Sequence, residues 1–164
     1  MAIWTGFLDK SGSPALKVSI SGPFESEQEF DAIIDTGFTG FVSMPLLKAF
    51  PLGLLLYGTA DVTLADGSVA PKLLAKGAVT VGGETQIGVV VLEPSSGDVL
   101  LGMDFLKKFE RVLIVTEGGK GVVLINQIEF DALSAASTKQ SAKPATPALA
   151  GLDDAIKAKK EPAS

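Results

Sequence analysis

The chain has 164 residues, of which 46% are hydrophobic and 20% are charged, and its formal net charge at pH 7 is −5. This acidic balance argues against nucleic acid or an anionic membrane as a partner, because both are negatively charged. The chain contains neither Cys nor His, which excludes Ser-His-Asp and Cys-His catalysis and zinc sites built from imidazole or thiolate. Acid–base chemistry would therefore fall to carboxylates, Lys, Tyr or water.

Short runs rich in Val, Ile and Leu alternate with turn residues, which is the pattern of an all-β domain. Strands are predicted over residues 2–8, 16–20, 30–34, 41–44, 57–64, 69–75, 77–81, 85–92, 98–102, 112–115 and 122–125. The Asp66-Gly67 and Gly82-Gly83 dipeptides each separate two of these runs, and such dipeptides are strong signals for a β-hairpin.

Two short helices are predicted between the strands. One begins near Pro45, whose fixed φ suits the first turn of a helix, and its expected buried face consists of Leu46, Leu47 and Phe50. The other covers residues 104–109, with inward positions expected for Phe105, Leu106 and Phe109.

Composition changes near residue 131, where large apolar residues become rare and Ala, Ser, Lys, Thr and Pro dominate. This shift predicts a folded domain over residues 1–130 and a disordered tail over residues 131–164. The most apolar stretch, residues 45–57, is interrupted by Lys48, Pro51 and Gly53 and is too short to span a bilayer. Residues 1–10 lack the pattern of a secretion signal, and the absence of Cys suits a reducing compartment, so a cytoplasmic location is predicted.

The predicted strand over residues 30–34 runs directly into Asp35-Thr36-Gly37. Gly37 permits backbone conformations and close approaches that a side chain would block, and the Thr36 hydroxyl can hydrogen-bond inward and lock the turn. A carboxylate at such a junction is a candidate catalytic group. The alternative is an ordinary turn that ends a core strand, since Asp and Gly are common turn residues.

Two later features accompany this tripeptide in a fixed order. A hairpin centred on Ala65, Asp66 and Gly67 comes first, and the apolar run Leu100-Leu101-Gly102 follows it and leads into the second predicted helix. This ordered set resembles the retropepsin-like aspartic proteases over about residues 2–130. The form of the first motif, with Phe38 after Gly37, looks most like a prokaryotic single-domain group with D-T-G-F at this place.

The resemblance implies an all-β, half-barrel acid-protease fold with a flap hairpin and one or two short helices. It implies that Asp35 is the catalytic residue, that Thr36 and Gly37 support it, and that the hairpin around Ala65, Asp66 and Gly67 closes over an extended peptide. Only one D-[TS]-G tripeptide is present, so the resemblance implies a homodimer in which two copies of Asp35 meet and the two Thr36 hydroxyls brace the loops. No metal, cofactor or covalent intermediate is implied.

Three functions follow from these patterns. The first is an aspartic endopeptidase that acts on peptide or protein substrates as a homodimer. The second is a catalytically weak β-barrel dimer that uses the same cleft as a peptide-binding or assembly module, since a fold does not determine a function. The third is a monomeric β-protein with Asp35 as a plain turn residue. Phe38 stands where many family members have Ala or Ser, and it is expected to fill an adjacent core or interface site. For Trp4, the resemblance favours a dimer interface over the core.

Overall fold

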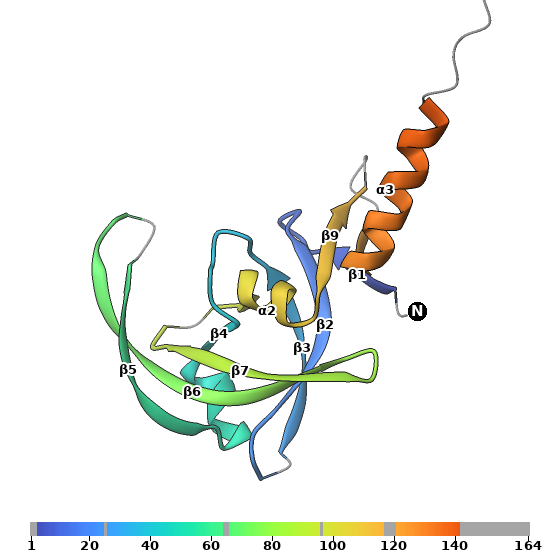
Figure 1. The fold of residues 1–164 in the computed structure, drawn as a ribbon. Helices are drawn as coiled ribbons and strands as arrows, with labels where there is room; N and C mark the ends of the chain where they lie inside the picture. Colours follow the sequence, from blue (N-terminus) through green and yellow to red (C-terminus); the bar gives the residue numbers. More distant parts are fainter. Residues whose placement is uncertain (1–2, 25, 64–65, 96, 117–120, 142–164) are drawn as a thin grey trace, which may run out of the picture. The chain divides into compact units, whose positions relative to one another are not determined.

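The computed structural model describes residues 3–24, 26–63, 66–95, 97–116 and 121–141, and the chain divides into two units, residues 1–130 and 131–164. All strands lie in the first unit (Figure 1) and confirm the predicted all-β class. They are β1 (Trp4–Leu8), β2 (Pro14–Ser21), β3 (Glu27–Ile34), β4 (Val42–Pro45), β5 (Leu55–Thr63), β6 (Val69–Val81), β7 (Glu84–Glu93), β8 (Val99–Leu101), β9 (Arg111–Val115) and β10 (Val122–Asn126).

Six of the strands close a small barrel. The sheet order is β5-β6-β7-β4-β8-β3-β2-β1-β10-β9, and an additional pairing of β6 with β2 joins the two ends of its central part. The pairings of β3 with β8 and of β4 with β7 are parallel, whereas the others are antiparallel. Closure satisfies the edges of these central strands and leaves β5 and β9 at the two ends of the order.

The two predicted glycine hairpins are present. The turn between β6 and β7 consists of Gly82 and Gly83, whose φ angles of 57° and 84° match a turn that requires left-handed backbone at both positions. The β5–β6 hairpin extends from the domain as a long ribbon (Figure 1). Strand β3 begins at Glu27, earlier than predicted, because its polar first half pairs with residues 18–21 of β2.

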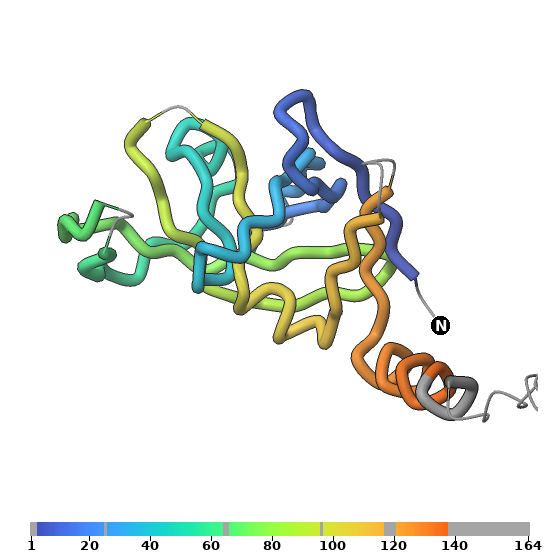
Figure 2. Tube along the Cα trace, turned by 90° about the horizontal axis from the view of Figure 1, so that it is seen from above, coloured from blue at the N-terminus to red at the C-terminus, as the bar shows by residue number. Residues whose placement is uncertain are grey.

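A cluster of aromatic side chains packs β1 against helix α2 (Met103–Lys108). Phe105, Leu106 and Phe109 are buried, as predicted. Trp4 is only 4% exposed, and its ring centroid lies 5.1 Å from that of Phe109. Trp4 is therefore a core residue of one chain, which corrects the expectation of a dimer interface. Its strand pairs with β10 of the same chain over residues 4–6, and Figure 2 shows the N-terminal strand beside the C-terminal strands of the domain.

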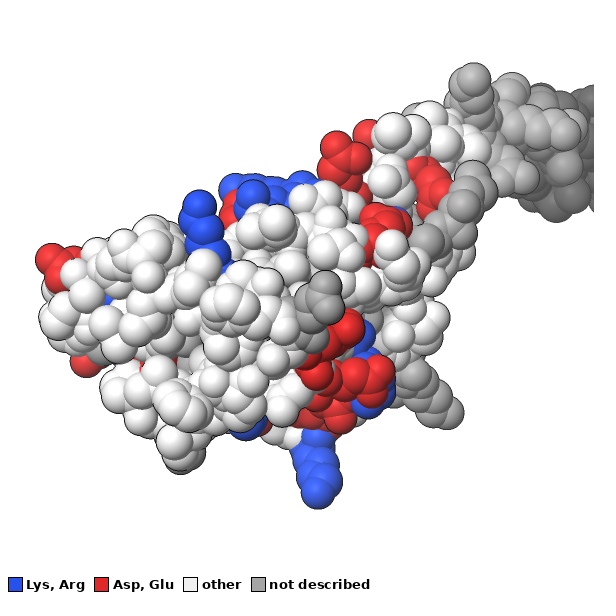
Figure 3. All heavy atoms as spheres, turned by 90° about the horizontal axis from the view of Figure 1, so that it is seen from below, with Lys and Arg blue, Asp and Glu red and all other residues white. Residues whose placement is uncertain are grey.

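The expected buried face of the first helix is wrong. Helix α1 (Leu46–Ala49) lasts one turn and continues as the 3-10 helix η1 (Phe50–Leu52). Leu47 and Phe50 are 82% and 81% exposed, whereas Ala49 and Leu52 are buried. The tighter 3-10 winding changes which positions face inward. Figure 3 shows a broad uncharged area on the side of the domain that carries the β5–β6 hairpin.

Helix α3 (Gln127–Ser141) crosses the predicted domain boundary at residue 130. Residues 131–141 were expected to be disordered, yet they are helical here. The segment has no Gly or Pro, several of its residues are good helix formers, and Asn126 Oδ1 accepts a hydrogen bond from the Ile128 N–H at 2.9 Å at the start of the helix. The division into a protease domain and a tail otherwise stays a prediction. Within the described residues, no helix is long and apolar enough to cross a membrane.

Candidate active site

Asp35 lies where β3 ends beside a parallel partner strand. Ile34 is paired with Leu101 of β8, and the Asp35 N–H donates to the Leu101 carbonyl oxygen at 2.9 Å. The apolar run before Asp35 and the apolar run before Gly102 therefore become neighbouring strands in the barrel. Because both strands are anchored in the core, the backbone that carries Asp35 has a fixed position.

The turn after Asp35 is held by its own carboxylate. The Phe38 N–H donates to the Asp35 carbonyl oxygen at 3.1 Å, and the Gly37 N–H donates to Asp35 Oδ1 at 2.9 Å. Thr36 is exposed, and no hydrogen bond of its hydroxyl occurs within the described part of the chain. The expected inward bond of Thr36 is therefore absent, and the Asp35 side chain locks the turn instead.

Phe38 connects this turn to the end of strand β8. A Cβ atom on Gly40 would lie 2.4 Å from Cζ of the Phe38 ring, and one on Gly102 would lie 2.2 Å from the Gly40 carbonyl oxygen and 2.6 Å from Phe38 Cδ1. The Met103 N–H donates to the Phe38 carbonyl oxygen at 2.8 Å. Phe38 is half-buried, and its ring lies against Gly40 and Gly102; the expectation that it fills a core or interface site stays a prediction. Glycine is required at Gly102, where an added Cβ would meet backbone oxygens, because the turn and β8 cross in close contact.

The carboxylate of Asp35 borders an open hollow of about 500 Å³. Thr36, Leu100, Leu113, Ser13 and Pro14 are among its other lining residues. Asp35 is half-buried, and Oδ1 is engaged by Gly37, whereas Oδ2 accepts no hydrogen bond from the described residues. One oxygen of this carboxylate can therefore act on a ligand that enters from this side. Among the described residues, no three Asp or Glu side chains are close enough together to hold a metal ion.

The flap hairpin carries the other predicted site residues. Asp66 Oδ1 accepts hydrogen bonds from the Ser68 hydroxyl at 2.6 Å and from the Ser68 N–H at 2.9 Å. Both bonds lower the pKa of Asp66 from its ordinary value, and the bond from the Ser68 hydroxyl has the larger effect. Gly67 has a φ of 82°, so the tip uses left-handed backbone that glycine adopts without strain. Ala65 lies outside the described residues.

An all-β barrel with one Asp-Thr-Gly turn, crossed by an apolar strand that ends in glycine, defines the class of aspartic proteases. A family model described as aspartyl protease matches residues 16–105, and the chain belongs to this family. The match confirms the recognition of an aspartic protease, whereas the narrower D-T-G-F grouping stays a prediction. No curated protein matches the chain.

Solved structures that are similar to the chain include two with 14% identity each. One is the EIAV protease in complex with the inhibitor HBY-793, with a TM-score of 0.48 over 58% of this chain and 86% of that one. The other is a retropepsin-like aspartic protease from Rickettsia conorii, with a TM-score of 0.49 over 75% of this chain and 90% of that one. The family assignment rests on the family match.

Sequence reasoning missed Leu113, which lies beside Asp35 in the hollow although it comes from the C-terminal part of the domain. It lies in the apolar run over residues 112–115, which predicted a strand and nothing more. Only the pairing of β9 with β10, and of β10 with β1, brings Leu113 to the turn at Asp35.

Proposed function

We propose that the chain is an aspartic endopeptidase that works as a homodimer, with Asp35 of each copy as the catalytic residue. The observation that supports this most directly is the Asp35 carboxylate, which has a fixed backbone and one oxygen without a partner among the described residues, beside an open hollow. One chain supplies one such group, and a two-fold arrangement supplies the second. Thr36 and Gly37 support the turn in this proposal, and the hairpin tip at Asp66 and Gly67 acts as the flap.

The chemistry follows from placing two carboxylates together. At a separation of about 3 Å they share one proton and titrate as a pair, which is an established property of aspartic protease dyads rather than a result of this structure. The ionised carboxylate removes a proton from a water molecule while the protonated one donates to the peptide carbonyl oxygen. The water oxygen then bonds to the carbonyl carbon, and breakdown of this adduct releases the amine. The chain carries the carboxylate for these steps and no His or Cys.

The test is cleavage of a degenerate peptide mixture over a series of pH values by the wild type and by Asp35→Asn. We expect the substitution to reduce cleavage by about 10²–10⁴-fold or more, because it removes the general base and the shared proton. Asp31→Asn is the matched control, since Asp31 lies on the same strand with its side chain 60% exposed and paired with Lys17. Equal cleavage by Asp35→Asn and wild type would remove the proposed activity.

The same assay distinguishes the alternative function. A peptide-binding or assembly module would bind peptides in the mixture without Asp35-dependent cleavage at any pH.

The cytoplasmic location also belongs to this proposal, and its basis is the Cys-free composition.

A further inference from the structure

The short helical segment after β4 presents apolar side chains to solvent. Leu47 and Phe50 are largely exposed, although Ala49 and Leu52 of the same segment are buried in the core. Beside them lies a hollow of about 330 Å³ whose lining residues are all apolar or glycine. Exposed apolar side chains that gather in one place mark a surface that binds something, whereas single ones do not.

Two neighbouring elements extend this surface. Leu56 of β5 lines the first hollow, and Leu55 lines a second hollow of about 210 Å³. Phe24, in the turn between β2 and β3, is 73% exposed, and its ring would lie 3.5 Å from a Cβ atom on Gly53. Figure 3 views the domain from below relative to Figure 1 and shows a broad uncharged area. We call this surface the apolar face; its protruding residues are Phe24, Leu47, Phe50, Leu55 and Leu56.

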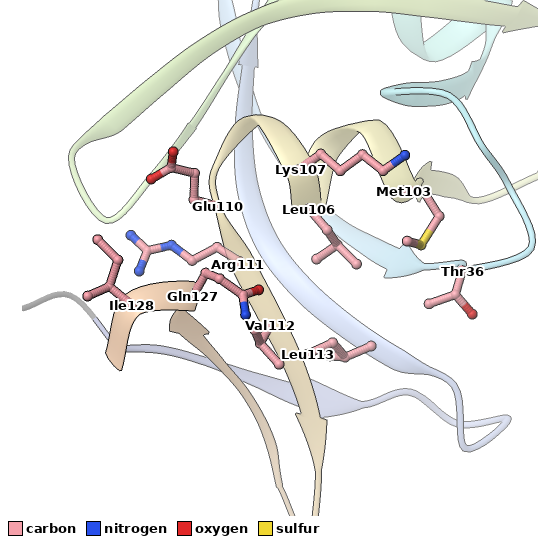
Figure 4. Close-up of a pocket in the computed structure, with 10 residues that line it drawn as sticks. All are labelled: Thr36, Met103, Leu106, Lys107, Glu110, Arg111, Val112, Leu113, Gln127 and Ile128. Carbon is pink, nitrogen blue, oxygen red and sulfur yellow. The ribbon is translucent and has the colours of Figure 1, made fainter. Parts of the chain in front are cut away.

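The charged side chains that adjoin the apolar face are basic. Residues 45–58 contain Lys48 and no Asp or Glu, and Lys76 is the one charged residue among those that line the two hollows. The Lys76 ammonium also lies 5.7 Å from the centroid of the Tyr57 ring. The hollow of Figure 4 differs, because both signs of charge, from Glu110 and Arg111, surround it.

This combination matches the boundary between the headgroups and the acyl chains of a membrane. Leu and Phe side chains bury in the acyl region, Tyr lies at headgroup level, and Lys extends its charge to the phosphates. A second copy of the chain fits less well. A two-fold contact would place Lys48 and Lys76 of each copy near the same lysines of the other, and the described residues that line the face supply no carboxylate to pair with them.

We propose that the apolar face docks on a membrane that contains anionic lipids, with Leu47 and Phe50 among the acyl chains and Lys48 and Lys76 at the phosphates. Such binding is peripheral, since no described helix is long and apolar enough to cross a membrane. It also refines the expectation from the net charge of −5. Charges more than about 8–10 Å from the contact are largely screened at physiological salt, so the local lysines decide the sign. The proposal does not depend on the chemistry of Asp35.

Sedimentation of the full chain with vesicles tests the proposal. One set of vesicles consists of phosphatidylcholine alone, and the other of phosphatidylcholine mixed with phosphatidylglycerol, which is anionic. We expect tighter binding to the mixed vesicles, and weaker binding to them as the salt concentration rises, because the lysine contacts are screened. Absence of binding to the mixed vesicles, or equal binding to both sets, would overturn the proposal.

Two pairs of variants locate the contact. Phe50→Ser should weaken binding to the mixed vesicles by about ten-fold or more, since it removes a buried aromatic side chain. Ile3→Ser is its control, because Ile3 is also exposed but precedes β1 and lines neither hollow. Lys48→Glu should weaken binding by about five- to thirty-fold, and Lys10→Glu makes the same change of charge in the turn after β1. Both controls should bind like the wild type, and a control that weakens binding as much as its partner variant contradicts the proposed face.

A fluorescent label measures insertion directly. The wild type contains no Cys, so Leu47→Cys carries a single thiol for a fluorophore whose emission shifts to the blue in an apolar environment. We expect this shift when the mixed vesicles are added, and no shift for the same label on Lys10→Cys. An unchanged emission at position 47 would show that the face does not enter the bilayer. If Phe50→Ser instead changes the association state of the lipid-free chain and leaves vesicle binding unchanged, the face is a contact between copies and the proposal is wrong.

Discussion

Substitution of Gly102 by Ala should destabilise the domain more than the same substitution at a glycine where an added Cβ meets open space. The Cβ atom of Gly102→Ala would lie 2.2 Å from the Gly40 carbonyl oxygen and 2.5 Å from the Phe38 carbonyl oxygen. Both contacts are with backbone atoms, which cannot rotate away. The φ and ψ of Gly102 are −99° and −168°, a conformation that alanine adopts freely, so the cost is steric. Overpacking of this kind costs about 1–3 kcal/mol and sometimes more, and we expect about 3 kcal/mol.

Urea unfolding measures this cost. With a denaturant slope of about 2 kcal/mol per molar, a loss of about 3 kcal/mol lowers the midpoint by about 1.5 M. Gly58→Ala is the matched control, because Gly58 lies in β5 and an added Cβ meets nothing within 4 Å. It should leave the midpoint nearly unchanged or raise it slightly. Both variants are compared at one protein concentration, since association raises apparent stability. A Gly102→Ala midpoint equal to that of Gly58→Ala would refute the steric reasoning.

Two further predictions concern the flap tip and the first helix. Ser68→Ala should raise the pKa of Asp66 toward its ordinary value, because it removes the hydroxyl bond that lowers it; a carboxylate NMR titration of wild type and variant measures the shift. Because the folded-state pKa of Asp66 is depressed, its contribution to stability is present above about pH 4 and is lost as the pH falls through the folded-state pKa. Phe50→Ser should change the free energy of unfolding by less than about 0.5 kcal/mol, since Phe50 is 81% exposed, whereas Leu52→Ala should cost about 2–5 kcal/mol. Thermal unfolding of Phe50→Ser and Leu52→Ala measures both costs. A larger loss for Phe50→Ser than for Leu52→Ala would contradict the buried face that the structure gives this segment.

Local signals predicted the hairpins and the turn at Asp35 well. Gly67, Gly82 and Gly83 adopt the left-handed backbone that the two hairpin signals indicate, and an apolar strand does end at Asp35. These features depend on neighbours in the sequence. The ordered set of motifs added the long-range part, since it indicated that the strand before Asp35 and the run before Gly102 belong to one site, and they pair in parallel.

Features that depend on distant contacts were not predictable from pattern. Leu47 and Phe50 were expected to be buried because a regular helix would place them on one face, but the segment is one α-turn followed by 3-10 structure. Trp4 is buried because Phe109 and the Arg111 guanidinium pack against its ring, the latter 4.2 Å from the ring centroid. No residue near Trp4 in the sequence indicates that Phe109 or Arg111 will contact it.

The parallel pairing of β3 with β8 also constrains the order in which the site can form during synthesis. The Asp35 N–H has its partner on Leu101, and the turn at Phe38 has its partner on Met103. A nascent chain that has not yet released these later residues from the ribosome holds Asp35 on an unsupported segment. The turn at Asp35 therefore gains its supporting strand only after nearly the whole barrel has been translated.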